Sequence, residues 1–75
     1  MDDDFVIQPI GGLRAVVSSE IILARCASVP EAIRAAVRVA SRTASYGRTV
    51  QVLVDEPGRG RTVIWDSTRD GFSGG

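Results

Sequence analysis

Residues 28–47, SVPEAIRAAVRVASRTASYG, decide the fold of this chain. Ser28 and Glu31 stand in the S-x-x-E arrangement of a capping box, in which the serine oxygen accepts a hydrogen bond from the Glu31 amide and the glutamate reaches back to the serine N–H. Pro30 falls in the first turn, where an N–H is not needed, and Gly47 can adopt the left-handed conformation that ends a helix. The segment predicts one helix of about 17 residues, roughly 25 Å long at 1.5 Å per residue.

Two sides of this helix differ in chemistry. Apolar residues recur at three- and four-residue spacing and predict a stripe that packs on the rest of the chain. The stripe consists of Val29, Ile33, Ala36, Val37, Ala40 and Ala44. On another side, Arg34, Arg38 and Arg42 are spaced four apart with no acidic residue beside them, and we call these three the arginine row. Like charges at this spacing cost roughly a few tenths of a kcal/mol, so the row is a candidate binding surface. The alternative is a solvated helix face whose arginine stems cover apolar surface.

Strand-like segments precede the helix. Residues 5–10 and 13–17 read as two short strands, and the Gly11-Gly12 pair between them predicts a tight hairpin, because primed turns need positive φ angles. Residues 20–27 are interpreted as a third strand on their Ile-Ile-Leu core. One or two helical turns capped by Ser19 are the alternative for this segment.

A clear hairpin follows the helix. Residues 48–55 alternate, so that Val50, Val52 and Val54 face one way. In the turn at 56–60, Pro57 and Gly58 suit the central positions of a type II turn. Residues 61–66 then return as the final strand.

The predicted architecture is α+β, an antiparallel sheet of four to five strands in ββ(β)αββ order with the helix packed on one face. The 75 residues make one domain, with an ordered core of about 4–67, a solvated acidic start at 2–4 and a flexible glycine-rich tail at 68–75. One helix covers only one sheet face. The other face still carries apolar residues, such as Leu53 and Ile64 or their alternates, so we expect a second copy or a ligand protein to cover it.

Composition narrows the possible functions. Nine basic and nine acidic residues give zero net charge, which argues against a dedicated polyanion binder. Histidine and lysine are both missing, so the commonest general bases and nucleophile activators are absent, and we expect no enzyme. Cys26 is the only cysteine, so a disulfide within one copy and a zinc site of the usual Cys/His kind are excluded, and we expect neither a cofactor nor a metal.

Location and size lead to two further expectations. The acidic first residues and the short apolar runs predict neither a signal peptide nor a membrane span, and a lone cysteine fits the cytoplasm. A chain this short buries only about 60% of its unfolded surface, and dimerisation would enlarge its core. We therefore expect a homodimer.

Further candidates for interaction lie near the helix and in the last hairpin. Arg48 could extend the arginine row into a positive strip about 12 Å or more long at 1.5 Å per residue. Arg59 and Arg61 stand in a Gly-Arg-Gly-Arg loop that could insert into a groove, although a plain hairpin turn also explains the glycines. Trp65 is expected in the core or in a dimer interface, where aromatic residues concentrate.

An alanine-rich helix side and the strand pair after it stand out between residues 5 and 66. They consist of Glu31-Ala32, Ala35-Ala36 and Ala40, and of Val50, Val52 and Gly60-Arg61. In this pattern the chain resembles small bacterial ββαββ proteins grouped as domains of unknown function. Those proteins combine an alanine-rich E-A-x-x-A-A-x-x-x-A helix face with a following V-x-V-x-x-x-x-G-R-x strand pair. The helix motif matches position by position, whereas seven residues and not four separate Val52 from Gly60 in this chain. At Phe5 this chain departs from the tryptophan usual in those proteins. In size and layout the chain also resembles small phage-encoded inhibitors of bacterial CRISPR defence, which implies binding without catalytic residues.

Two functions therefore stand as hypotheses. The first is a small non-catalytic interaction module, homodimeric, that binds another protein, with a phage- or mobile-element-encoded inhibitor of a host complex as its concrete form. The second is a nucleic-acid-binding accessory protein that uses the arginine row and the Arg59/Arg61 loop.

Overall fold

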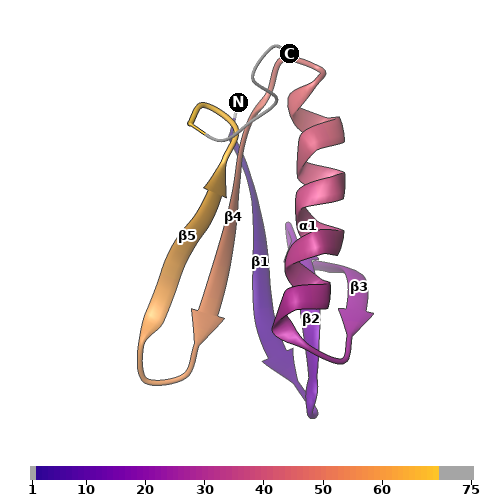
Figure 1. Ribbon diagram of the computed structural model, residues 1–75, viewed down its shortest axis with the longest axis vertical. Coiled ribbons are helices and arrows are strands. Elements are labelled where there is room, and N and C mark those ends of the chain that lie inside the picture. Colours follow the sequence, from indigo (N-terminus) through magenta and orange to yellow (C-terminus); the bar gives the residue numbers. More distant parts are fainter. Residues whose placement is uncertain (1, 70–75) are drawn as a thin grey trace.

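The computed structural model describes residues 2–69. Within this range a single sheet lies under one helix, which gives two layers (Figure 1). The elements in chain order are β1 (Asp2–Ile10), β2 (Leu13–Ser18), β3 (Ile21–Cys26), α1 (Val29–Ala44), β4 (Thr49–Glu56) and β5 (Gly60–Asp66). The α+β class and the ββ(β)αββ order are confirmed, and the segment at 20–27 is a strand, not a helical turn.

The sheet is mixed, so the expectation of an antiparallel sheet is wrong. Its strand order is β3-β2-β1-β4-β5, and the central pair β1–β4 is parallel, with register from Asp2 opposite Thr49 to Ile7 opposite Val54. The remaining pairs are antiparallel. Two hairpins reverse the chain twice, so that β3 runs in the direction of β1. Helix α1 then carries the chain back along the sheet, so that β4 starts at the same end as β1 (Figure 1).

The parallel pairing also corrects the expected start of the first strand. Strand β1 begins at Asp2 and not at residue 5, because its first residues pair with the first residues of β4. Asp3 forms a two-point ion pair with Arg48, in which Nη2 donates to Oδ1 at 3.1 Å and Nε donates to Oδ2. At the other end, the Arg69 N–H donates to the Asp66 carbonyl at 3.0 Å, which closes a turn. The flexible tail was predicted for 68–75, and its part at 70–75 lies outside the described residues.

Helix α1 begins and ends as its sequence predicts. Ser28 is the N-cap, and its Oγ accepts from the Glu31 N–H at 3.4 Å. Past the last turn, Gly47 has a φ of +86° and donates its N–H to the Ala44 carbonyl at 2.9 Å. The helix is 16 residues long, close to the expected length.

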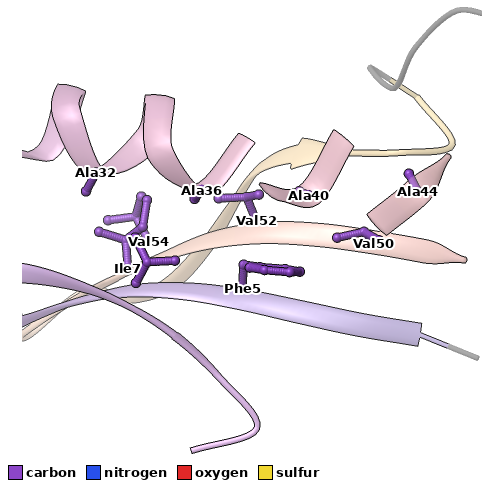
Figure 2. Close-up of a cluster of buried hydrophobic side chains, with 10 residues drawn as sticks. Phe5, Ile7, Ala32, Ala36, Ala40, Ala44, Val50, Val52 and Val54 are labelled. Carbon is purple, nitrogen blue, oxygen red and sulfur yellow. The ribbon is translucent and has the colours of Figure 1, made fainter. Parts of the chain in front are cut away.

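The core lies between α1 and the covered face of the sheet. Four alanines spaced four apart form the fully buried side of the helix, and Ile33 and Val37 of the predicted stripe pack beside them, half-buried. The four are Ala32, Ala36, Ala40 and Ala44. Beneath them lie Phe5 and Ile7 of β1 and the three valines of β4 that were predicted to share a face (Figure 2). Small alanine side chains let the helix backbone lie close to these larger groups.

Two turns at the ends of β2 have the same backbone shape but different residues. Gly11 and Gly12 join β1 to β2 with φ angles of +54° and +85°, the pattern of a type I′ turn, as predicted. Ser19 and Glu20 join β2 to β3 with φ angles of +51° and +67°, although both carry a side chain. Non-glycine residues adopt this conformation at a cost of about 1–2 kcal/mol each. The Ser19-Glu20 turn is therefore a strained site in the fold.

Candidate protein-interaction surface

The sheet face opposite α1 carries a group of apolar residues among polar and charged ones, and no layer lies over it within residues 2–69; we call it the open face. Cross-strand register places Val6 of β1 beside Val17 of β2 and Leu53 of β4 on this face. The apolar residues of the open face are Val6, Ile10, Leu13, Ala15, Val17, Ile22, Leu53 and Val63. Ala15 is buried among its neighbours, whereas Ile10, Leu13, Ile22 and Val63 are exposed. The open face thus spans all five strands.

A bulge changes which residue of β5 belongs to this face. The β4–β5 register shifts between Val52 and Leu53, so that Leu53 lies opposite Val63 and Ile64 has no partner on β4. Ile64 packs against the core cluster instead. The expectation of Leu53 on the open face is confirmed, whereas Val63 takes the place expected for Ile64. A bulge of this kind cannot be located from strict alternation, because it inserts one residue into the period of two.

The open face is hollowed by a broad, open depression of about 490 Å³. Val6, Val17 and Ile22 contribute apolar side chains to its lining, while Glu20 and Arg61 contribute charges of opposite sign. A concave apolar surface with a few polar groups is the usual form of a binding site. Its breadth suits a protein surface better than an enclosed small molecule.

Three charged groups of β4 and β5 on this face are held by an ion pair or by hydrogen bonds. Arg61 Nε lies 3.7 Å from Asp55 Oδ2 on the neighbouring strand. Asp66 accepts from Gln51 Nε2 at 2.9 Å, from the Thr68 hydroxyl at 2.6 Å and from the Thr68 N–H at 2.8 Å. The hydrogen bonds from Thr68, then that from Gln51, lower the pKa of Asp66 to about 2. The lowered pKa keeps Asp66 ionised, and Asp66 and the Asp55–Arg61 pair together form a polar border of the face.

The ion pair between Asp3 and Arg48 explains the shifted pKa values of these two side chains. The hydrogen bond from Arg48 lowers the pKa of Asp3, and the same bond raises the pKa of Arg48. Arg48 therefore has a structural partner that ties the start of β4 to β1. Within residues 2–69, no group of three or more cysteine, aspartate or glutamate side chains lies close enough together to hold a metal ion.

The sequence-predicted interaction residues fall on separate surfaces. The arginine row is exposed on α1, and no ion pair within residues 2–69 involves its members. Arg48 lies beyond the helix with Asp3, and Arg59 is exposed in the β4–β5 turn. Arg61 lies on the open face, in the opposite layer from the row. The structure therefore does not bring these arginines together into one strip.

Trp65 and Cys26 contribute to packing. Trp65 lies opposite Val52, on the covered side of the sheet, and packs half-buried against the core. Cys26 is also half-buried against the same cluster. Among the described helices, none has the length and hydropathy needed to cross a membrane.

One exposed feature was missed by the sequence reasoning. Strand β3 is at an edge of the sheet, and its residues Ile21, Ile22 and Leu23 are all exposed. The Ile-Ile-Leu run predicts a strand, and no interaction residue was predicted within it. Its three consecutive apolar residues were the available clue, because such a run cannot turn every side chain to one covered face.

Comparisons with models of protein families, with curated proteins and with solved structures find no match to this chain. The resemblances drawn from its sequence pattern therefore stay predictions.

Proposed function

We propose that this protein is a small non-catalytic interaction module that binds another protein through the open face. The observation that carries this proposal is a sheet with apolar residues on both faces and a helix over only one of them. Contiguous exposed apolar surface on a small protein marks an interaction site. An inhibitor that occupies a surface of a host complex is one concrete form of such a module, because it needs binding alone.

The size of the open face suits a specific protein partner. Five strands spaced about 4.8 Å apart, each about seven residues long at 3.3 Å per residue, cover roughly 550 Å² in projection. Specific interfaces bury about 800 Å² of accessible surface on each partner, and accessible surface exceeds projected area. The partner that fits is a protein with an apolar patch, bordered by polar groups that meet Gln8 and the Asp55–Arg61 pair.

The distribution of arginines favours a protein over a nucleic acid as the partner. A nucleic-acid groove needs several cations on one surface to follow the phosphates. Here the arginine row lies in the helix layer and Arg61 in the opposite layer, while Arg48 and Arg61 each lie beside a carboxylate. The zero net charge points the same way.

The test compares two valine-to-aspartate variants with equal exposure. Val63 on the open face and Val39 on α1 are each 36% exposed, so Val63→Asp and Val39→Asp add the same charge to opposite layers. The immobilised chain is used to capture a partner from the native host, and the purified partner is then titrated by calorimetry. We expect Val63→Asp to weaken binding by about tenfold or more, since an unpaired charge buried in an interface costs more than about 1.4 kcal/mol. Val39→Asp should leave the affinity unchanged.

Two results would overturn the proposal. One is equal loss of affinity in both variants, which would place the contact elsewhere. The other is a captured ligand that proves to be DNA or RNA, with an affinity that falls steeply as salt rises. Ile10→Asp, at a second exposed position of the open face with the same 36% exposure, checks that the effect belongs to the face and not to one residue.

A further inference from the structure

The two edges of the sheet differ in chemistry. On β3, three consecutive apolar side chains are exposed, Ile21 by 62%, Ile22 by 39% and Leu23 by 46%. On β5, the other edge, the exposed residues begin with Gly60, Arg61 and Thr62. Sheet edges carry unpaired N–H and C=O groups that can pair with another chain, and folded proteins protect them with charges or short strands. The run of three exposed apolar residues leaves this part of β3 without a protecting charge.

We propose that β3 pairs antiparallel with β3 of a second copy, which joins two five-stranded sheets into one of ten strands. The argument for a second copy is the charge pattern around the apolar run. Glu20 precedes the run and Arg25 follows it, so the two ends carry opposite charges. In an antiparallel self-pairing centred between Ile22 and Leu23, Glu20 of each copy lies opposite Arg25 of the other. Two-fold symmetry makes this contact twice.

Both charges are available for that contact. Arg25 and Glu20 are exposed, and neither forms an ion pair within its own copy over residues 2–69. Glu20 lies in the turn before β3, and the four residues 21–24 separate it from Arg25, roughly 13 Å of strand at 3.3 Å per residue, so the two charges do not neutralise each other. A parallel self-pairing would bring like ends together. The charge pattern therefore selects the antiparallel arrangement.

A bulge at the centre of β3 limits how tightly two copies are expected to associate. The β2–β3 register shifts between Val16 and Val17, and Leu23 has no partner on β2. Such a bulge twists an edge and shortens the ladder that a second copy can form. Both edge strands carry a bulge, so a bulge does not explain why the run of three consecutive exposed apolar residues lies on β3 and not on β5. Pairing of a six-residue strand buries less than about 1,200 Å², so we expect a dimer that dissociates on dilution.

A charge swap tests the pairing. Sedimentation velocity from about 5 to about 500 µM measures the dimer fraction. Glu20→Arg alone and Arg25→Glu alone each set like charges opposite one another at two symmetric places, and each should weaken association about tenfold. The double variant restores opposite charges and should recover the wild-type dissociation constant to within about threefold. Circular dichroism of the dilute monomer checks that each variant keeps its fold.

Matched edge variants complete the test. Leu23→Lys on β3 should abolish the dimer, whereas Thr62→Lys on the β5 edge should leave it unchanged. A protein that stays monomeric at every concentration overturns the proposal. So does a dimer whose dissociation constant is the same in the wild type and in both single charge variants. Loss of the dimer in Val63→Asp but not in Leu23→Lys would instead show two open faces stacked together. The inference does not depend on the proposed function, because the edge and the face respond to different variants.

Discussion

Replacing Ser19 with glycine should stabilise the fold. Ser19 has a φ of +51° at the first central position of the β2–β3 turn, where a side chain costs about 1–2 kcal/mol. Glycine removes this strain but adds about 0.5–1 kcal/mol of conformational entropy lost on folding. The difference is about 0–1.5 kcal/mol, and its midpoint of about 0.75 kcal/mol corresponds to a rise in Tm of about 3–6 °C for a domain of this size.

The chain contains a matched control for this variant. Gly11 stands at the same position of the β1–β2 turn with a φ of +54°, and a Cβ built there meets no atom within 4 Å. The cost of Gly11→Ala is therefore conformational, and Tm should fall by about the amount that Ser19→Gly raises it.

Thermal unfolding of the dilute monomer measures both effects. Far-UV circular dichroism and the fluorescence of Trp65, the one tryptophan of the chain, give two independent signals. The two variants lie in the turns at opposite ends of the six-residue strand β2, roughly 20 Å apart at 3.3 Å per residue, and should combine additively. The reasoning would be refuted by an unchanged or lower Tm in Ser19→Gly together with a lower Tm in Gly11→Ala. That outcome would mean that the Ser19 side chain makes contacts worth more than the strain.

Three further predictions concern the core, the Asp3–Arg48 ion pair and the hydrogen-bonded carboxylate of Asp66. Ile7→Ala should cost about 2–5 kcal/mol in urea unfolding, a large part of the roughly 4–11 kcal/mol expected for a chain of this length, whereas Ile10→Ala on the open face should cost less than about 1 kcal/mol. In a double-mutant cycle of Asp3→Asn and Arg48→Gln, the coupling should shrink as salt rises, because both side chains are partly exposed; a coupling independent of salt would contradict this. The folded pKa of Asp66 is about 2 against an ordinary value of 3.8, so its contribution to stability is complete above about pH 3.8 and disappears as the pH falls through about 2. Asp66→Asn should accordingly flatten the acid side of the urea-midpoint profile, and a profile of unchanged slope would refute the assignment.

The helix was predictable because its signals are local. Ser28 caps the first turn and Gly47 ends the last one, and each acts through hydrogen bonds to residues only a few positions away. The Gly11-Gly12 turn was predictable for the same reason, since its backbone needs positive φ at two adjacent residues. The Ser19-Glu20 turn has the same shape, but its conformation comes from the pairing of β2 with β3 and not from residues that prefer it.

The candidate surface was only partly predictable. The sequence predicted one sheet with two faces and only one helix. Because one helix can cover only one face, an uncovered face with apolar residues was predictable. Which residues occupy it depended on a bulge at Ile64 that alternation cannot reveal. The position of β3 at an edge depends on the order of the strands in the sheet. This order could not be predicted from the sequence, because nothing in it excluded any of the five strands from an edge.

The sequence by itself determined the bounds of the helix, the two hairpins at Gly11-Gly12 and at 56–60, the apolar side of the helix and the presence of more apolar surface than one helix can cover. Tertiary structure alone decided that β1 and β4 run parallel in the middle of the sheet, that Asp2–Ile10 is one continuous strand, and that the arginines fall in different layers. The physical reason is the distance along the chain over which each kind of interaction acts. Caps, turns and periodicity act over a few residues, whereas strand order and register arise from contacts between segments far apart in the chain.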